Sequence, residues 1–153
     1  MDKFTPKETS KGAEEIVLTQ IKQDFITPAN AIFDYVDMVE KVLNDAELTS
    51  EDEIAQIKSS CSHLIDQYQV AFLQNTGVNA ETTKKSPEEY SELRHNLRTP
   101  LNAIIGYSEI LMEDYEDDLE ESALEDFQQI INLARETEKA IEIFVDYIRG
   151  EAI

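Results

Sequence analysis

Residues 93–110 of this chain read LRHNLRTPLNAIIGYSEI, and residues 21–38 read IKQDFITPANAIFDYVDM. With a shift of 72 residues between the two stretches, six of their eighteen positions are identical. The identical pairs are Thr27/Thr99, Pro28/Pro100, Asn30/Asn102, Ala31/Ala103, Ile32/Ile104 and Tyr35/Tyr107. Two unrelated amphipathic helices would share an apolar period, but threonine, proline and asparagine are poor residues for a helix interior. The shared pattern T-P-x-N-A-I-x-x-Y therefore predicts an internal duplication.

Apolar residues recur at helical spacing in four segments around these stretches. The predicted helices span about residues 13–43, 51–72, 87–115 and 122–149. The second and fourth helices also align, with a shift of 76, so that Ile54 falls on Ile130 and Tyr68 on Phe144. Ser86 is a typical N-cap ahead of Pro87 in the first turn, and Gly150 is a candidate C-cap of the last helix.

The chain therefore divides into four parts. We expect an N-terminal tail (residues 1–11), a first hairpin (12–74), a linker (75–86) and a second hairpin (87–150). One hairpin cannot bury its apolar stripe alone, whereas two can close a four-helix bundle. The predicted fold is all-α, with two helical hairpins forming an intramolecular, pseudo-dimeric four-helix bundle. Helices of ~30 residues are about 45 Å long, and we expect the linker to run back along this rod.

The composition narrows the classes of function. With 33 acidic and 13 basic residues, the formal charge is −20. Phosphate contacts would then cost repulsion, which excludes nucleic-acid binding and disfavours anionic membranes. No apolar run approaches the ~18 residues of a membrane span, and the start of the chain lacks the apolar stretch of a signal peptide. A single cysteine fits a reducing compartment, so we expect a cytoplasmic protein.

His95 is the strongest candidate for a chemically active side chain. At about 100° per residue it lies about 160° from the core residue Leu97, so its side chain should stand in solvent. Thr99, four residues later, lies on the same outward face. Pro100 removes the backbone hydrogen bond to the carbonyl of Asn96 and should kink the helix.

The residues from His95 onward read H-N-L-R-T-P-L, which resembles the box H-E/D-x-x-T/N-P-L of the dimerisation and phosphoacceptor domain of sensor histidine kinases. The hairpin around the box covers residues 87–150, and residues 12–74 resemble the same domain more weakly. In that family, two chains pair their hairpins into a four-helix bundle. The resemblance implies that this chain holds both hairpins and imitates the dimer.

The resemblance also implies roles for the box residues. His95 would be the phosphoacceptor, since a neutral imidazole nitrogen is nucleophilic near neutral pH. Thr99 matches the position that orients water when the phospho-aspartate of a receiver is hydrolysed. Arg98 would be either a cation near the phosphoryl group or a salt-bridging residue, and Pro100 would supply the kink.

Two residues depart from the family pattern. Asn96 stands where the family has an acid, which would hold the ring N–H and stabilise the imidazolium. Losing such assistance costs ~10²–10⁴ in rate, which favours phosphoryl relay over autophosphorylation. In the first repeat, Gln23 stands where His95 lies in the second, so the first hairpin should be structural.

We therefore expect a histidine phosphotransfer module that exchanges a phosphoryl group between His95 and an aspartate of a response-regulator receiver domain. No cofactor is expected, because Mg²⁺ would come with the receiver. No ATP-binding boxes are recognisable, so the ATPase domain of a partner histidine kinase would be another phosphoryl source. Two alternatives stay open: a non-catalytic coupling domain regulating an attached or partner cyclase, phosphatase or kinase, and a receiver phosphatase that uses Thr99. We expect a monomer, with a homodimer as the alternative.

Three other features have simpler interpretations. His63 is expected to face solvent, and Cys61 to be a small core residue. The acidic segment 113–126 lacks the spacing of an EF-hand, which favours a solvated turn over a divalent-cation site.

Overall fold

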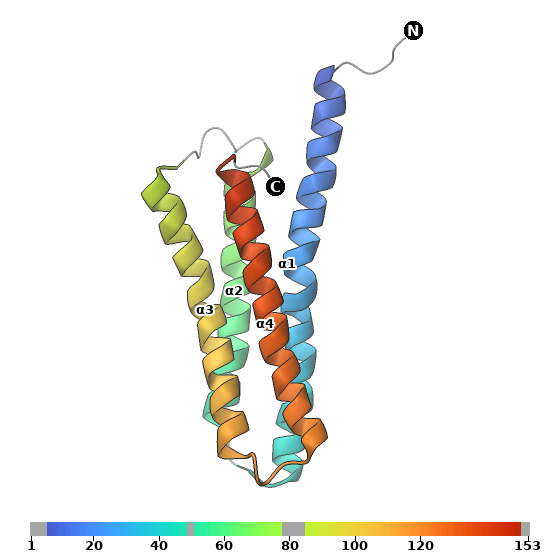
Figure 1. Ribbon diagram of the computed structural model, residues 1–153, viewed down its shortest axis with the longest axis vertical. Coiled ribbons are helices and arrows are strands. Elements are labelled where there is room, and N and C mark those ends of the chain that lie inside the picture. The colour runs from blue at the N-terminus through green and yellow to red at the C-terminus, as the bar shows by residue number, and fades with distance from the viewer. Residues whose placement is uncertain (1–5, 49–50, 78–84, 151–153) are drawn as a thin grey trace.

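The computed structural model describes residues 6–48, 51–77 and 85–150, with side chains from Gly12 onward. It contains the helices α1 (Pro6–Asp45), α2 (Glu51–Asn75), α3 (Pro87–Asp114) and α4 (Glu121–Ile148), and no strand occurs in the described part of the chain. The helices run alternately up and down in one bundle, and the N-terminal part of α1 projects beyond the others (Figure 1). The predicted all-α four-helix bundle is confirmed.

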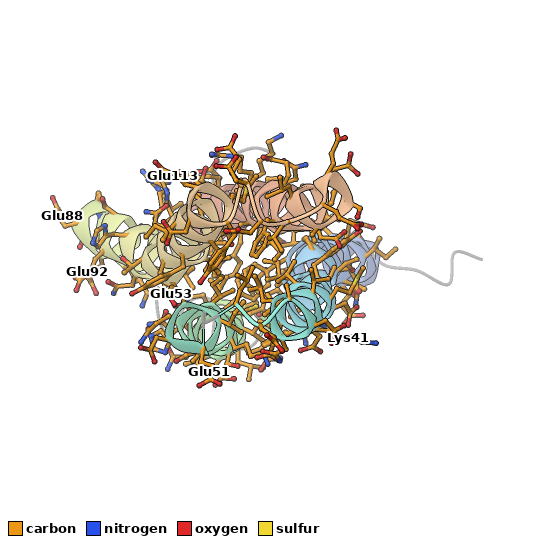
Figure 2. All side chains as sticks on the ribbon, turned by 90° about the horizontal axis from the view of Figure 1, so that it is seen from below. Lys41, Glu51, Glu53, Glu88, Glu92 and Glu113 are labelled. Atoms are coloured by element: carbon orange, nitrogen blue, oxygen red, sulfur yellow. The ribbon has the colours of Figure 1, made fainter. Side chains whose placement is uncertain are left out.

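The helices form a ring in which α1 packs against α2 and α4, and α3 also packs against α2 and α4. The two helices that carry the repeated stretch, α1 and α3, therefore occupy diagonal corners. Seen end-on, side chains fill the space between the helices, while Lys41, Glu51 and Glu113 point outward (Figure 2). This arrangement places α3 between two neighbours and leaves its outer face open.

Aromatic side chains fill the part of the core that lies toward the C-terminal ends of α2 and α4. The rings of Phe25 and Tyr68 stack with 3.6 Å between their centroids, and Phe144 lies 4.9 Å from Tyr68. All three rings are fully buried, and they join α1, α2 and α4. The Tyr68 hydroxyl donates to the carbonyl of Ile21 at 3.5 Å, which gives this polar atom a buried partner. Burial, and secondarily the charge of Asp24, raises the pKa of Tyr68.

The two copies of the repeat lie in equivalent environments. Between residues 23–38 and their partners 95–110, the degree of burial agrees at every pair except Asp34 and Gly106. Both internal prolines, Pro28 and Pro100, are buried within their helices. The agreement supports the register of the alignment, while common descent of the two hairpins stays a prediction.

The second hairpin begins and ends as its sequence predicts. Ser86 and Glu89 form a capping box, with the Glu89 N–H donating to the Ser86 hydroxyl at 3.2 Å and the Ser86 N–H donating to the Glu89 carboxylate at 3.1 Å. Helix α3 continues through Pro100 as one helix. After α4, Gly150 adopts a φ of 85° and donates to the carbonyl of Tyr147 at 3.0 Å, which suits glycine at this position.

Two expectations about the connections need correction. The segment assigned to a loose tail, residues 1–11, is helical from Pro6 onward, because proline fits the first turn, where its missing N–H would have no partner. The expected linker need not run along the rod, since α2 ends and α3 begins at the same end of the bundle (Figure 1). Most of that linker (78–84) lies outside the described residues.

Candidate functional site

His95 stands on the outer face of α3, as its position in the helix predicts. Its side chain is exposed, whereas Leu97 and Leu101 are 1% and 0% exposed. One turn later, the exposed Thr99 donates its hydroxyl proton to the backbone carbonyl of His95 at 2.9 Å. This bond ties the Thr99 side chain to the turn that carries His95, while the hydroxyl oxygen can still accept a hydrogen bond.

Two arginines flank His95 and connect α3 to α4. Arg94 pairs with Glu142 at 2.9 Å and with Asp146 at 3.5 Å. Arg98 pairs with Glu138 at 3.4 Å and more loosely with Glu142 at 3.9 Å. These guanidinium groups are partly exposed, so each pair contributes little free energy alone, but together they fix the helix beside His95. Of the two roles open to Arg98, the structure shows the salt-bridging one.

The contribution of Arg94 was not foreseen from the sequence. Arg94 and Arg98 are four residues apart, as are Glu138 and Glu142, so each pair forms a stripe on its own helix. Stripes of opposite charge predict ion pairs between two helices once the helices are known to be neighbours. The sequence alone does not say which face of α4 meets α3.

Other residues of the box open onto a groove between α2 and α3. The groove has a volume of about 380 Å³ and is lined by Ser59, Ser60, His63, Gln67, Asn96, Thr99, Pro100 and Ala103. His95 and Arg98 are not among its lining residues. The structure thus brings Asn96, Thr99 and Pro100 together on one side of α3 and places Arg98 on the side that faces α4. His63 is exposed as predicted, but it forms part of this groove.

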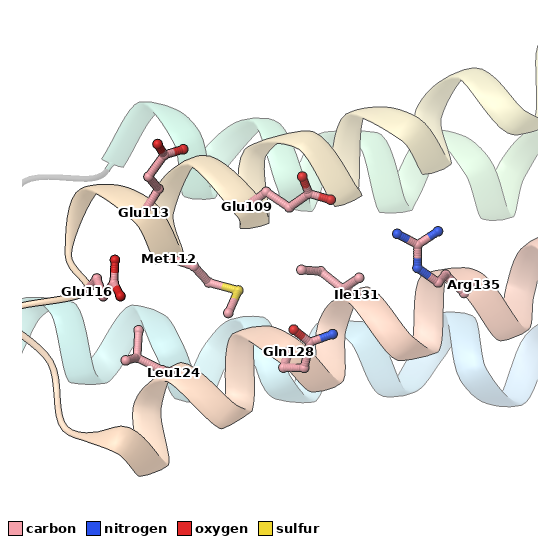
Figure 3. A pocket seen from close by; sticks show the side chains of 8 residues that line it. All are labelled: Glu109, Met112, Glu113, Glu116, Leu124, Gln128, Ile131 and Arg135. Atoms are coloured by element: carbon pink, nitrogen blue, oxygen red, sulfur yellow. The ribbon is translucent and has the colours of Figure 1, made fainter.

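A larger groove, between α3 and α4, lies further along the bundle (Figure 3). It has a volume of about 470 Å³ and is lined by Glu109, Met112, Glu113, Glu116, Leu124, Gln128, Ile131 and Arg135. Met112, Leu124 and Ile131 are its apolar lining residues. Glu109 and Glu113 lie on α3, Glu116 lies on the connection after it, and Arg135 lies at the end nearer the N-terminus of α3 (Figure 3). The acidic segment, predicted to be a solvated turn, contributes Glu113, Glu116 and Leu124 to this groove, which the sequence did not predict.

The α3–α4 groove and His95 lie on the same side of α3. Glu113 follows His95 by eighteen residues, which is five full turns and about 27 Å along the axis. The bundle therefore carries an exposed imidazole and a partly apolar hollow along one face. Sequence spacing could relate His95 to Glu113, but the hollow also needs side chains from α4.

Three further features of the described residues bear on the predictions. No three histidine, cysteine, aspartate or glutamate side chains within them are arranged to hold a metal ion. None of the described helices combines the length and apolarity needed to cross a membrane. Cys61 is fully buried, its thiol donates to the carbonyl of Ala29 at 3.4 Å, and burial raises its pKa to about 12. Cys61 is therefore a core residue, as predicted.

The second hairpin matches a model of a known protein family. Residues 88–153 match the family model of the His Kinase A (phospho-acceptor) domain. The matched segment contains α3, except for its first residue, and α4, so the resemblance of the second hairpin to phosphoacceptor domains is confirmed. No curated protein and no solved structure matches the chain significantly. The match indicates a role in two-component signalling.

Proposed function

Because the second hairpin matches a phosphoacceptor domain, we propose that this chain is a histidine phosphotransfer module of a two-component phosphorelay. His95 accepts a phosphoryl group from a receiver domain or a partner kinase and returns it to a receiver aspartate. The observation that carries this proposal is the exposed imidazole of His95, held in the box H-N-L-R-T-P-L on the outer face of a packed bundle.

The exchange needs only an accessible ring nitrogen on this chain. The lone pair of that nitrogen attacks phosphorus, and the new P–N bond forms as the P–O bond to the receiver aspartate breaks. The aspartate leaves as a carboxylate with the electron pair, and the proton on the other ring nitrogen can pass to water. In the reverse step the carboxylate attacks and the imidazole leaves. Mg²⁺ held by the receiver would neutralise charge on the phosphoryl oxygens.

Asn96 favours this relay over attack on ATP. Its exposed amide can accept a hydrogen bond from the His95 ring, but it carries no negative charge and takes up no proton. Transfer between an acyl phosphate and imidazole needs less help from a base, because the aspartate leaves as a stable carboxylate. Arg94 and Arg98 act by holding α3 against α4 through their ion pairs.

The groove between α3 and α4 supports receiver docking beside His95. The nearest groove residue on α3, Glu109, is fourteen residues and about 21 Å from His95 along the helix. A domain of ~100 residues has a radius of gyration of about 13 Å and is therefore roughly 34 Å across. One such domain can rest in the groove and still place an aspartate against the imidazole.

Phosphotransfer assays test the proposal. Receiver domains of the source organism, loaded with radiolabelled acetyl phosphate, are incubated with the chain, and label on the chain is measured before and after acid treatment. We expect acid-labile label that disappears in His95→Gln and persists in the matched control His63→Gln. Equal labelling of wild type and His95→Gln would refute the proposal.

A second candidate is a non-catalytic coupling domain that regulates an attached or partner effector. It is favoured by Asn96 in place of the family's acid and by Gln23 in place of a second histidine. In that case wild-type protein stays unlabelled with every receiver and with an active histidine kinase, and His95→Gln leaves regulation of the effector unchanged.

A further inference from the structure

The α1–α2 side of the bundle is the counterpart of the α3–α4 groove. A symmetric dimer of hairpins would carry two identical grooves, but here the two sides can differ because their sequences differ. The shifts of 72 and 76 residues pair each residue of the α3–α4 groove with one on the first hairpin. The apolar groove residues Met112, Leu124 and Ile131 correspond to Glu40, Leu48 and Ala55.

The counterpart carries a charge in place of one apolar residue of the groove. Glu40 places a carboxylate where the half-buried Met112 supplies a thioether. Leu48 matches Leu124, and Ile131 is only 4% exposed, so Met112 makes the main apolar difference between the two sides. Burial of apolar surface contributes roughly 25 cal/mol per Å², so contact of a partner with Met112 favours the α3–α4 side.

An ion pair also bridges the seam between α1 and α2. The ammonium group of Lys58 on α2 donates a hydrogen bond to Glu40 on α1 at 2.8 Å and lies 3.7 Å from Asp37. The hydrogen bond to Glu40 is the main cause of a raised pKa of Lys58, so this group stays charged. The counterpart of Lys58 in the second hairpin is Ala134, which is fully buried. A partner packing over the α1–α2 seam would have to desolvate the Lys58 bridge, which is costly.

The rim formed by α3 is more acidic than its counterpart on α1. It carries Glu109 and Glu113, with Glu116 just beyond the end of the helix. Glu113 corresponds to Lys41 and Glu116 to Asn44, while the third counterpart, Asp37, lies beside Lys58. Lys41 and Glu113 both point outward from the bundle (Figure 2). A basic flank on a partner would be attracted more strongly to the α3 rim, because Lys41 and Lys58 offset the acidic residues of the α1 rim.

We infer that the bundle has one receiver-docking surface, the groove between α3 and α4, and that the ion-paired α1–α2 seam excludes a second receiver. The occupant is a receiver helix with an apolar ridge flanked by lysine or arginine. This inference rests on the proposed function. Each chain then binds one receiver. That receiver lies next to His95, whereas the equivalent position of the first hairpin carries Gln23.

The test measures binding separately from transfer. The probe is a receiver that labels the chain in the phosphotransfer assay, or, if none does, each purified receiver of the source organism in turn. Isothermal titration with His95→Gln protein, which lacks the acceptor, should give one receiver per chain. Binding without labelling of the wild type would refute the proposed function and leave this inference intact. Two receivers per chain, or no binding by any of them, would overturn the inference.

Swaps between equivalent residues locate the surface. Glu113→Lys, which places the residue of the first hairpin in the groove, should weaken receiver binding at least tenfold and reduce its dependence on salt. Met112→Glu, which removes apolar surface from the groove, should also weaken binding, with the melting temperature measured to exclude unfolding. The matched control Lys41→Glu should leave the affinity within twofold. Unchanged binding in Glu113→Lys and Met112→Glu, or a loss in Lys41→Glu, would contradict docking at α3–α4.

Discussion

At the scale of single residues, the repeated stretch allows direct comparisons between equivalent positions. His95 and Gln23 are both exposed at equivalent positions, so the packing of the bundle does not depend on which of them is present. Ser108 and Val36 are both fully buried at equivalent positions, and here the choice of side chain has an energetic consequence. The Ser108 hydroxyl has no hydrogen-bond partner among the described residues.

Removal of this hydroxyl should stabilise the protein. A buried polar atom without a partner costs ~1–3 kcal/mol, so Ser108→Ala should raise the free energy of unfolding by about 1 kcal/mol more than a control. Ser91→Ala on the exposed side of the same helix is the matched control, because it shares the gain in helix propensity. Chemical denaturation of both variants measures the difference. A destabilised Ser108→Ala would mean that the hydroxyl has a partner or that the lost volume dominates.

The sequence predicted whether a side chain is exposed or buried wherever that depends on its position in its own helix. The outward placement of His95 and the burial of Cys61 follow from the apolar period of their own helices. The ion pairs of Arg94 and the neighbours of His63 were not predictable, because they depend on which faces of different helices meet. For the same reason the α3–α4 groove appears only when Met112 and Ile131 are brought together.

At the scale of elements, the start of α3 depends on its capping box. Two groups of Ser86, its backbone N–H first and its hydroxyl second, lower the pKa of Glu89. A carboxylate whose pKa is lower in the folded state stabilises that state at a pH above its unfolded pKa, and the contribution disappears as the pH falls through the folded pKa.

Glu89→Gln should therefore lower the melting temperature at pH 7, and the difference from wild type should shrink as the pH falls below the ordinary carboxyl value of 4.5. Thermal melts of both proteins across this range provide the measurement. Glu92→Gln, on the same helix and exposed, should show a smaller effect at pH 7. A difference that grows on acidification would contradict the role of the ionised Glu89.

At the scale of the whole molecule, four helices of one chain complete the ring, so a second copy is not required for a closed core. We expect a monomer with the mass of one chain, 17.5 kDa, in sedimentation equilibrium. Its thermal midpoint should not change with protein concentration, whereas the midpoint of an obligate dimer rises with concentration. A mass of two chains, or a concentration-dependent midpoint, would indicate exchanged hairpins.

The covalent connection between the two hairpins has a genetic consequence. In a homodimer, one codon change alters both subunits, so a gain on one surface is accompanied by the same change on the other. Here a codon belongs to one half alone. The first half can therefore carry Gln23 and the Lys58 bridge and serve as scaffolding, while selection acts independently on the half that carries His95.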